Sequence, residues 1–123
     1  MNKTALLLLA LIAMSCNNQQ RSCKDFRTGK FEFTQMINGK KHTSTFTRTE
    51  NLQIETYNGK TDTASVRWVN DCEFILQKLH PKNMKEEKAI SMIILSTDKN
   101  TYSFEYSFVG SNKKERGLVT KLD

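Results

Sequence analysis

The sequence has little proline, little glycine and few histidines. One proline and five glycines among 123 residues exclude a collagen-like or Pro/Gly-rich chain. The longest apolar run, residues 5–14, is about half the length of a membrane-spanning helix, which excludes a polytopic membrane protein. Charged residues at 26% and apolar residues at 37% are typical of a globular protein, and the length allows one domain.

Motifs of catalysis and metal binding are also missing. No Ser-His-Asp pattern, glycine-rich phosphate loop or HExxH sequence is present. The two histidines, His42 and His80, have no second ligand at metal-binding spacing, so no zinc site is expected. Carboxylates that are candidates to pair across strands are Glu55, Glu73 and Glu105, but such charges are usually only solvated. We therefore expect no enzyme activity, no metal and no cofactor.

The N-terminus resembles the export signal of a bacterial lipoprotein. A short, positively charged opening precedes an apolar run with the length of a signal-peptide core. Ser15-Cys16 is similar to the end of a lipobox, in which a small residue precedes a cysteine that becomes lipidated. The resemblance implies a signal peptide at residues 1–15, acylation of Cys16 and a polar tether at residues 16–22. An ordinary signal peptide that leaves Cys16 free is the alternative.

Export changes the charge and the expected location. Without residues 1–15 the net charge falls from +6 to +5 and the apolar fraction to about 32%, a thin core for a chain of this size. Residues 17–20 contain no acid, which by analogy with lipoprotein sorting favours an outer-membrane protein facing the periplasm over surface display. The acyl chains on Cys16 would hold the protein on the membrane. Nucleic acid is not expected as a partner there.

The basic residues fall in three stretches, residues 27–41, 82–88 and 113–121. Such stretches are either solvated faces or a surface that lies against anionic headgroups.

Two cysteines remain if Cys16 is lipidated. In an oxidising compartment we expect Cys23 and Cys72 to form a disulfide. The bridge would contribute roughly 4 kcal/mol in the chain-entropy account of disulfides. A redox or nucleophilic cysteine is the alternative, but the sequence offers neither a CxxC spacing nor a nearby histidine for it.

From residue 30 onward apolar residues recur at every second position, which predicts strands. The Asn-Gly pair at residues 38–39 predicts a two-residue hairpin that pairs Phe31 with Phe46 and Phe33 with Ser44. Eight strands joined by tight turns predict an all-β fold, an antiparallel up-and-down meander that closes into a barrel over residues 23–123. The later strands are expected near residues 41–48, 52–57, 61–68, 72–78, 89–96, 102–108 and 115–122, and residues 84–88 are a candidate helical turn.

The connection at residues 58–59 decides which side chains face the interior. A two-residue turn would pair Leu52 with Ser65, whereas a three-residue loop would pair Leu52 with Val66. We prefer the loop, because a slip of one residue would turn the apolar set to the wrong face.

The next connection concerns the disulfide. A loop at residues 69–71 would pair Trp68 with Cys72 and place the tryptophan beside the bridge. Cys23 and Cys72 lie at the same end of an up-and-down sheet, but four strand spacings in a flat sheet would separate them by about 19 Å. We therefore expect residues 23–29 to cross beneath the barrel.

Alternating aromatic residues are the main candidate for a ligand site. Tyr102, Phe104, Tyr106 and Phe108 share one face of the expected seventh strand. A barrel of eight strands is either filled by side chains or holds one small ligand, so these aromatics are core or pocket lining. The candidate ligand contacts are Trp68, Tyr102, Phe104, Tyr106 and Gln35.

Residues 23–33, 67–76 and 117–122 carry a resemblance to a known group of proteins. The chain resembles a family of short flavobacterial lipoproteins without assigned activity, and the Trp-x-x-x-Cys stretch that ends at Cys72 is the most specific part of the likeness. Some relatives carry the name DNA topoisomerase IV, which does not fit a chain too small for an ATPase and a cleavage domain. Gly29-Lys30-Phe31 is more distantly similar to the first strand of lipocalin-like barrels.

These features predict a non-enzymatic envelope lipoprotein with a small, lipocalin-like barrel that binds a small apolar ligand or an envelope component. The alternative is a protein-binding module similar to the lipid-anchored lysozyme inhibitors. The positive charge of the chain disfavours a strongly basic lysozyme as the target.

Overall fold

The computed structural model describes residues 21–123. The signal peptide at residues 1–15, the lipidated Cys16 and most of the tether expected above lie outside these residues. Within the described part, no helix has the length and apolar character needed to cross a membrane.

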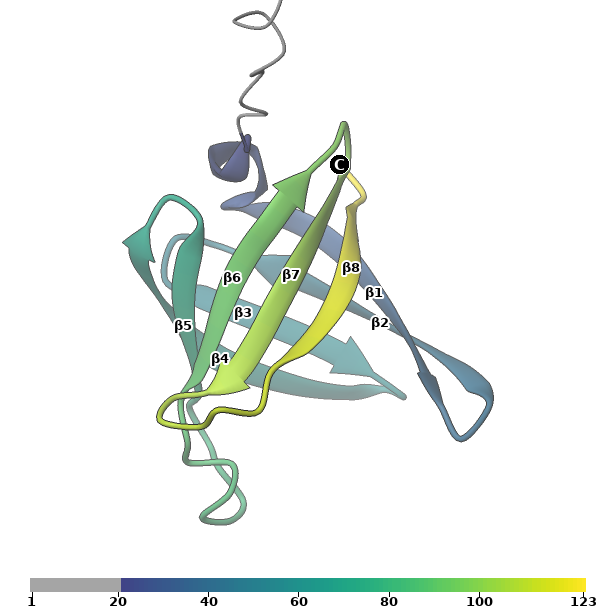
Figure 1. Cartoon of the computed structure of the whole chain (residues 1–123). Coiled ribbons are helices and arrows are strands. Elements are labelled where there is room, and N and C mark those ends of the chain that lie inside the picture. Colours follow the sequence, from purple (N-terminus) through teal and green to yellow (C-terminus); the bar gives the residue numbers. More distant parts are fainter. Residues whose placement is uncertain (1–20) are drawn as a thin grey trace, which may run out of the picture.

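Eight antiparallel strands form a closed up-and-down barrel, as the sequence predicts (Figure 1). Each strand pairs with the next, and β8 returns to pair with β1, where Phe33 lies opposite Val119. The closure leaves no free edge strand within the barrel wall. The strands are β1 (Gly29–Ile37), β2 (Lys40–Arg48), β3 (Leu52–Tyr57), β4 (Lys60–Asn70), β5 (Glu73–Lys78), β6 (Ile90–Thr97), β7 (Thr101–Phe108) and β8 (Glu115–Lys121).

The two ends of the barrel differ. At the closed end lie the 3-10 helix η1 (Cys23–Phe26) and the connections at residues 48–52, 70–73 and 97–101. At the other end, here named the open mouth, lie the turns at residues 38–39 and 58–59 and the connections at residues 79–89 and 109–114. Residues 84–88 form turns rather than the helical turn considered above.

The first hairpin has the predicted register. Phe31 pairs with Phe46 and Phe33 with Ser44, and the two strands continue outward as a ribbon to the turn at residues 38–39 (Figure 1). Gly39 adopts a positive φ of 77° there, as a two-residue hairpin turn of this type requires.

The register predicted for β3 and β4 is wrong by one residue. Leu52 pairs with Ser65 instead of Val66, because residues 58–59 form a two-residue turn in which both φ angles are positive. That turn fits the right-handed twist of an antiparallel pair of strands. The stability gained from this fit outweighs the stability that burying Leu52 would add. Gln53 and Glu55, instead of Leu52, therefore share the inward side of the sheet with Val66.

The connection between β4 and β5 also differs from the prediction. Trp68 pairs with Phe74 rather than Cys72, and an irregularity between Trp68 and Asn70 lets the chain turn through residues 71–72. Cys72 lies in this turn, where its backbone N–H donates to Asn70 Oδ1 at 2.9 Å. The shift is by two residues, so the inward faces of both strands remain as predicted. Trp68 still packs against the core cluster that contains Cys23.

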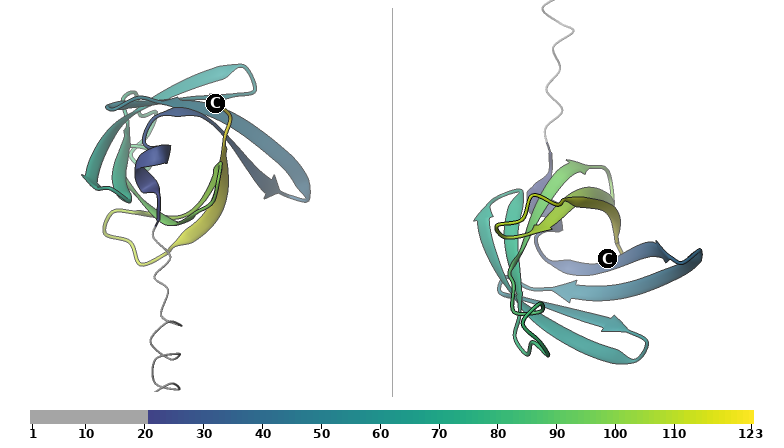
Figure 2. Two further views of the ribbon diagram at one scale, coloured as in Figure 1. Left: turned by 90° about the horizontal axis from the view of Figure 1, so that it is seen from above. Right: turned by 60° about the horizontal axis from the view of Figure 1, so that its bottom comes forward.

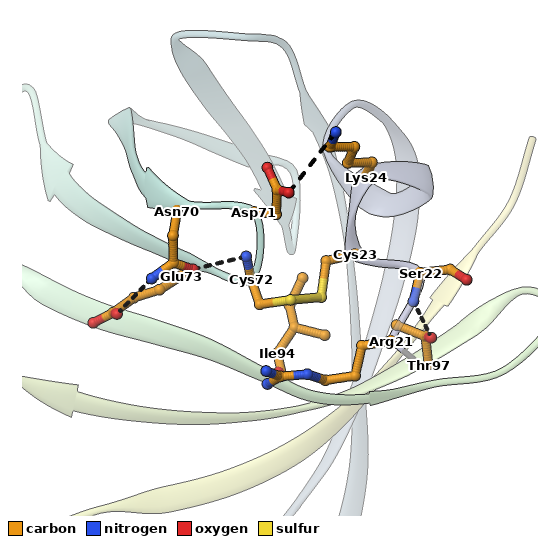
Figure 3. Close-up of a disulfide and its surroundings, with 10 residues drawn as sticks. All are labelled: Arg21, Ser22, Cys23, Lys24, Asn70, Asp71, Cys72, Glu73, Ile94 and Thr97. Atoms are coloured by element: carbon orange, nitrogen blue, oxygen red, sulfur yellow. Dashed lines mark hydrogen bonds and ion pairs between the residues drawn. A yellow bond between two sulfur atoms is a disulfide. The ribbon is translucent and has the colours of Figure 1, made fainter. Parts of the chain in front are cut away.

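The segment before β1 closes one end of the barrel. Viewed from above, η1 lies inside the ring of strands (Figure 2), and its Cys23 and Phe26 are buried. The predicted disulfide is present: Cys23 is bonded to Cys72, with their Cα atoms 5.3 Å apart. Arg21 donates to Ile94 O and the Ser22 N–H to Thr97 Oγ1, which fixes the preceding residues to β6 (Figure 3). The crossing segment is thus held by the disulfide to the turn at residues 71–72 and by two hydrogen bonds to β6.

Candidate functional site

A buried arginine fills the closed end. Arg48 is the last residue of β2 and, like Phe46 two residues before it, points into the barrel. It is 1% exposed. Its guanidinium packs 4.7 Å from the ring of Phe31 and 4.6 Å from that of Phe74. Burial lowers the pKa of this guanidinium, but arginine stays protonated in proteins, so a positive charge is held in the core.

Hydrogen bonds compensate this buried charge. The Arg48 Nη2 atom donates to Phe26 O at 2.9 Å and Nε to Arg27 O at 3.2 Å, which satisfies the carbonyls where η1 ends. Nη1 donates to Gln53 Oε1, and the Tyr102 hydroxyl accepts from both terminal nitrogens. All five N–H donors therefore have acceptors, and Arg48 joins the crossing segment to β3 and β7.

Packing around this arginine makes the closed half of the barrel solid. Tyr102 and Phe104 are 1% and 4% exposed, and they belong to one core cluster with Phe26, Phe31 and other buried side chains. Burial raises the pKa of the Tyr102 hydroxyl, and the nearby Arg48 charge opposes this shift. The two aromatics therefore act as core, one of the two roles considered for them.

The other three candidate ligand contacts lie in different places. Trp68 is half-buried, and the guanidinium of Arg27 lies over its indole, 4.8 Å from the ring centre. The indole Nε1 atom has no hydrogen-bond partner among the described residues. Tyr106 donates to Glu115 at 2.5 Å, a bond that raises the pKa of its hydroxyl to about 12. Gln35 is exposed on the protruding part of the first hairpin.

A cavity of about 430 Å³ lies at the open mouth, within the range of small-molecule sites. None of the five predicted contacts lines it. The walls come from β3, β4, β5 and the connection at residues 79–89, with one residue each from β6 and β7. The lining residues are Gln53, Glu55, Asp62, Thr63, Ala64, Leu76, Lys78, Asn83, Lys85, Glu86, Lys88, Ile90 and Phe108.

An ion-pair network joins the connection at residues 79–89 to the cavity wall. Lys78 Nζ lies 2.9 Å from Asp62 on β4 and 3.4 Å from Glu86 in the connection. The bond to Asp62 is the main reason that the pKa of Lys78 is raised. Asn83 Oδ1 accepts from the Glu86 N–H, and the Gln77 side chain donates to Glu87 O. The connection is therefore held against the barrel although its side chains are exposed.

Glu55 is the carboxyl of the cavity that the network leaves out. It forms no ion pair with a side chain of the described residues. Burial and then the neighbouring Asp62 raise the pKa of Glu55, whereas Lys78 and a hydrogen bond with Ser44 oppose this shift. The local environment thus favours the neutral form of this side chain.

Apolar side chains form the inner part of the cavity. Ala64 and Leu76 lie one step deeper along β4 and β5 than Asp62 and Lys78, and Ile90 and Phe108 continue this apolar surface on β6 and β7, where Ile90 pairs with Leu76. The cavity is therefore amphipathic, with an apolar inner part and a charged rim, which suits binding of an amphipathic small molecule.

Sequence reasoning missed the cavity for a definite reason. Gln53 and Glu55 face inward only in the observed register of β3 and β4, and the prediction had placed Leu52 there. The turn at residues 58–59 was the signal that could have found them, because its Asn-Gly sequence is identical to that of the first hairpin. Arg48 was also missed, although it follows Ser44 and Phe46 at alternate positions.

The ionisable side chains that line the cavity are carboxylates and lysines. None of the residues that line the cavity is a histidine, cysteine or serine. Residues 21–123 also contain no group of three His, Cys, Asp or Glu side chains placed to hold a metal ion.

Comparison with known proteins adds no relative: no protein-family description, curated protein or solved structure matches the chain.

Proposed function

We propose that this protein is a non-enzymatic, lipid-anchored protein of the bacterial outer membrane, facing the periplasm, and that its barrel binds a small ligand with an apolar part. The cavity at the open mouth is the observation that carries the proposal. Its inner part offers Ala64, Leu76, Ile90 and Phe108 to an apolar group, and its rim offers charged side chains.

The position of the cavity relative to the tether supports this function. Arg21 lies at the closed end, where it donates to Ile94 O on β6 (Figure 3). The cavity is lined by residues of the open mouth, at the opposite end of the barrel. An acyl chain on Cys16 would therefore attach the solid end to the membrane and leave the cavity open to the periplasm.

Native mass spectrometry of the protein purified from its own host tests the proposal. We expect a bound molecule whose mass disappears in an Ala64→Phe variant, because the new ring fills the cavity. The matched control is Arg67→Phe, which places the same ring at an exposed position on the same strand and should retain the molecule. Folding of both variants is checked by the fluorescence of Trp68. A wild-type protein without bound molecule, or equal retention by both variants, would contradict the proposal.

Two further measurements test the anchor. The intact mass of the purified protein should show acyl chains on Cys16 and no residues 1–15. Protease treatment of intact cells should not release the barrel if the protein faces the periplasm, and release would show surface display.

A protein-binding module is the second candidate. The open mouth carries exposed apolar side chains on three of its connections, Ile37, Met84 and Val109, at 41%, 82% and 59% exposure. Such side chains occur at the centres of protein interfaces. Cross-linking in cells decides between the candidates: a photoreactive residue at position 84 should give a discrete protein adduct only if this second function holds.

A further inference from the structure

The net positive charge of the described residues is concentrated at one end of the barrel. The open mouth has eight lysines and three glutamates in its connections and the strand residues that flank them, whereas the closed end has six basic and six acidic residues. The other residues of the described part are balanced, so the whole excess of positive charge lies at the mouth. The ranges counted are 37–41, 57–61, 79–89 and 109–115 for the mouth, and 21–29, 48–52, 70–73, 97–101 and 121–123 for the closed end.

Two of these lysines line the cavity without a charge partner. Lys85 and Lys88 belong to the cavity wall, and neither forms an ion pair in the described residues. Lys78, the third lysine of the wall, is already held by Asp62 and Glu86. The cations available to a ligand are therefore on the connection at residues 79–89.

Exposed apolar side chains also occur on the same connection, outside the cavity lining. Met84 lies next to Lys85 in the sequence and is 82% exposed, and Leu79 at the start of the connection is 47% exposed. An apolar inner part and unpaired cations in the same lining match a molecule with an apolar chain and an anionic head.

Two of the three carboxylates that line the cavity are already bound to a cation. Asp62 and Glu86 share Lys78 as their ion-pair partner. A ligand cation would therefore compete with Lys78 for these two carboxylates.

We propose that the ligand is an anionic amphiphile whose apolar chain enters the cavity and whose head group is bound by Lys85 and Lys88. This inference rests on the proposed function and names the chemical class of its ligand. Head groups of the carboxylate and phosphate type share the required chemistry, since both accept charge-assisted hydrogen bonds from ammonium groups.

The test uses three twelve-carbon probes that differ only in the head group: dodecanoate, dodecanol and dodecyltrimethylammonium. The full-length protein purified from its host, in one non-ionic detergent, is titrated with each probe, and occupancy is measured by native mass spectrometry. Because detergent takes up the three probes to different extents, each probe is compared between protein variants. The variant Lys85→Gln/Lys88→Gln removes both cations, and Lys24→Gln/Lys99→Gln removes two cations at the closed end as a matched control.

We expect the Lys85→Gln/Lys88→Gln variant to weaken dodecanoate binding roughly tenfold, the size expected for two exposed charge contacts. Binding of dodecanol should not change, and the control variant should bind all three probes as the wild type does. The effect on dodecanoate should shrink as NaCl rises from about 0.05 to about 0.5 M.

Three results would overturn the inference, and only the third would also contradict the proposed function. If the wild type binds dodecanol and the Lys85→Gln/Lys88→Gln variant binds dodecanoate as tightly as the wild type does, the cavity binds a ligand but does not require an anionic head group. Equal weakening of dodecanol and dodecanoate would show that the variant damages the cavity instead of removing a charge contact. Absence of binding by all three probes to the wild type would contradict both the inference and the proposed function.

Discussion

Replacement of Arg48 by methionine is the most informative test of how the closed end is held. Methionine has a similar length and fits between aromatic rings, but it cannot donate to the carbonyls of Phe26 and Arg27. The substitution therefore removes the contacts between β2 and the crossing segment while the apolar packing is largely kept.

The expected loss follows from the acceptors that remain buried. Each unsatisfied buried acceptor costs about 1–3 kcal/mol, and two backbone carbonyls lose their donor. Relief from burying the guanidinium of Arg48 offsets part of this cost. We expect the free energy of unfolding to fall by about 2–4 kcal/mol, and Tm by about 8 °C or more in a domain of this size.

Urea denaturation with the disulfide intact measures this loss. The single tryptophan, Trp68, is a suitable probe because its ring centre lies 5.9 Å from the Arg48 guanidinium. The control is Arg67→Met, which makes the same change at an exposed position of β4 and should alter stability by less than about 0.5 kcal/mol. Arg48→Lys should not restore the stability of the wild type. The ammonium of lysine is compact, whereas the planar guanidinium of arginine directs its donors to acceptors on three sides.

An Arg48→Met protein as stable as the wild type would refute this reasoning. It would mean that burying the charge costs as much as its five hydrogen bonds return, as occurs for some buried ion pairs. Full rescue by Arg48→Lys would show that the charge alone, and not the geometry of the guanidinium, holds the closed end.

Three further predictions concern the disulfide, the core and the cavity. The Cys23→Ser/Cys72→Ser variant should lose roughly 4 kcal/mol in urea denaturation, since the bridge spans a sequence separation of 49, and a change below about 1 kcal/mol would contradict this. Gly117→Ala should cost about 1–3 kcal/mol, measured as a fall in Tm, because a Cβ at this site would lie 2.7 Å from the Phe104 ring; an unchanged Tm would show that the ring moves aside. Glu55 has a raised pKa in the folded protein, so the stability it contributes is present below its ordinary pKa of 4.5 and is lost as pH rises through the folded value. Glu55→Gln should therefore gain stability relative to the wild type as the pH rises above 4.5 in urea titrations, and a difference that does not change with pH would contradict the assignment.

The fold was predictable because its main signal is periodic. Alternation at Phe31 and Phe33, and again along β7, fixed the strands and their inward faces, and the cysteine count fixed the bridge. The distance between Cys23 and Cys72 in a flat sheet then required the crossing segment that the structure contains.

The cavity was not predictable by the same reasoning because it depends on polar residues that face inward. Hydrophobicity favoured Leu52 as an inward residue, whereas the turn at residues 58–59 imposes the register that turns Gln53 and Glu55 inward. Turn geometry therefore overrides burial at this point, and the apolar residue lies on the outer face of the barrel. The distribution of lysines between the two ends also needed the order of the strands, because the residues that form the mouth are far apart in the sequence.

The most direct measurement of the central claim is a crystal structure of the protein purified from its own host without exchange of bound molecules. We predict continuous electron density in the cavity between Ala64, Ile90 and Phe108, with its polar end at Lys85 and Lys88. A cavity that contains only water, or that is filled by its own side chains, would contradict the claim that this barrel binds a small ligand at its open mouth.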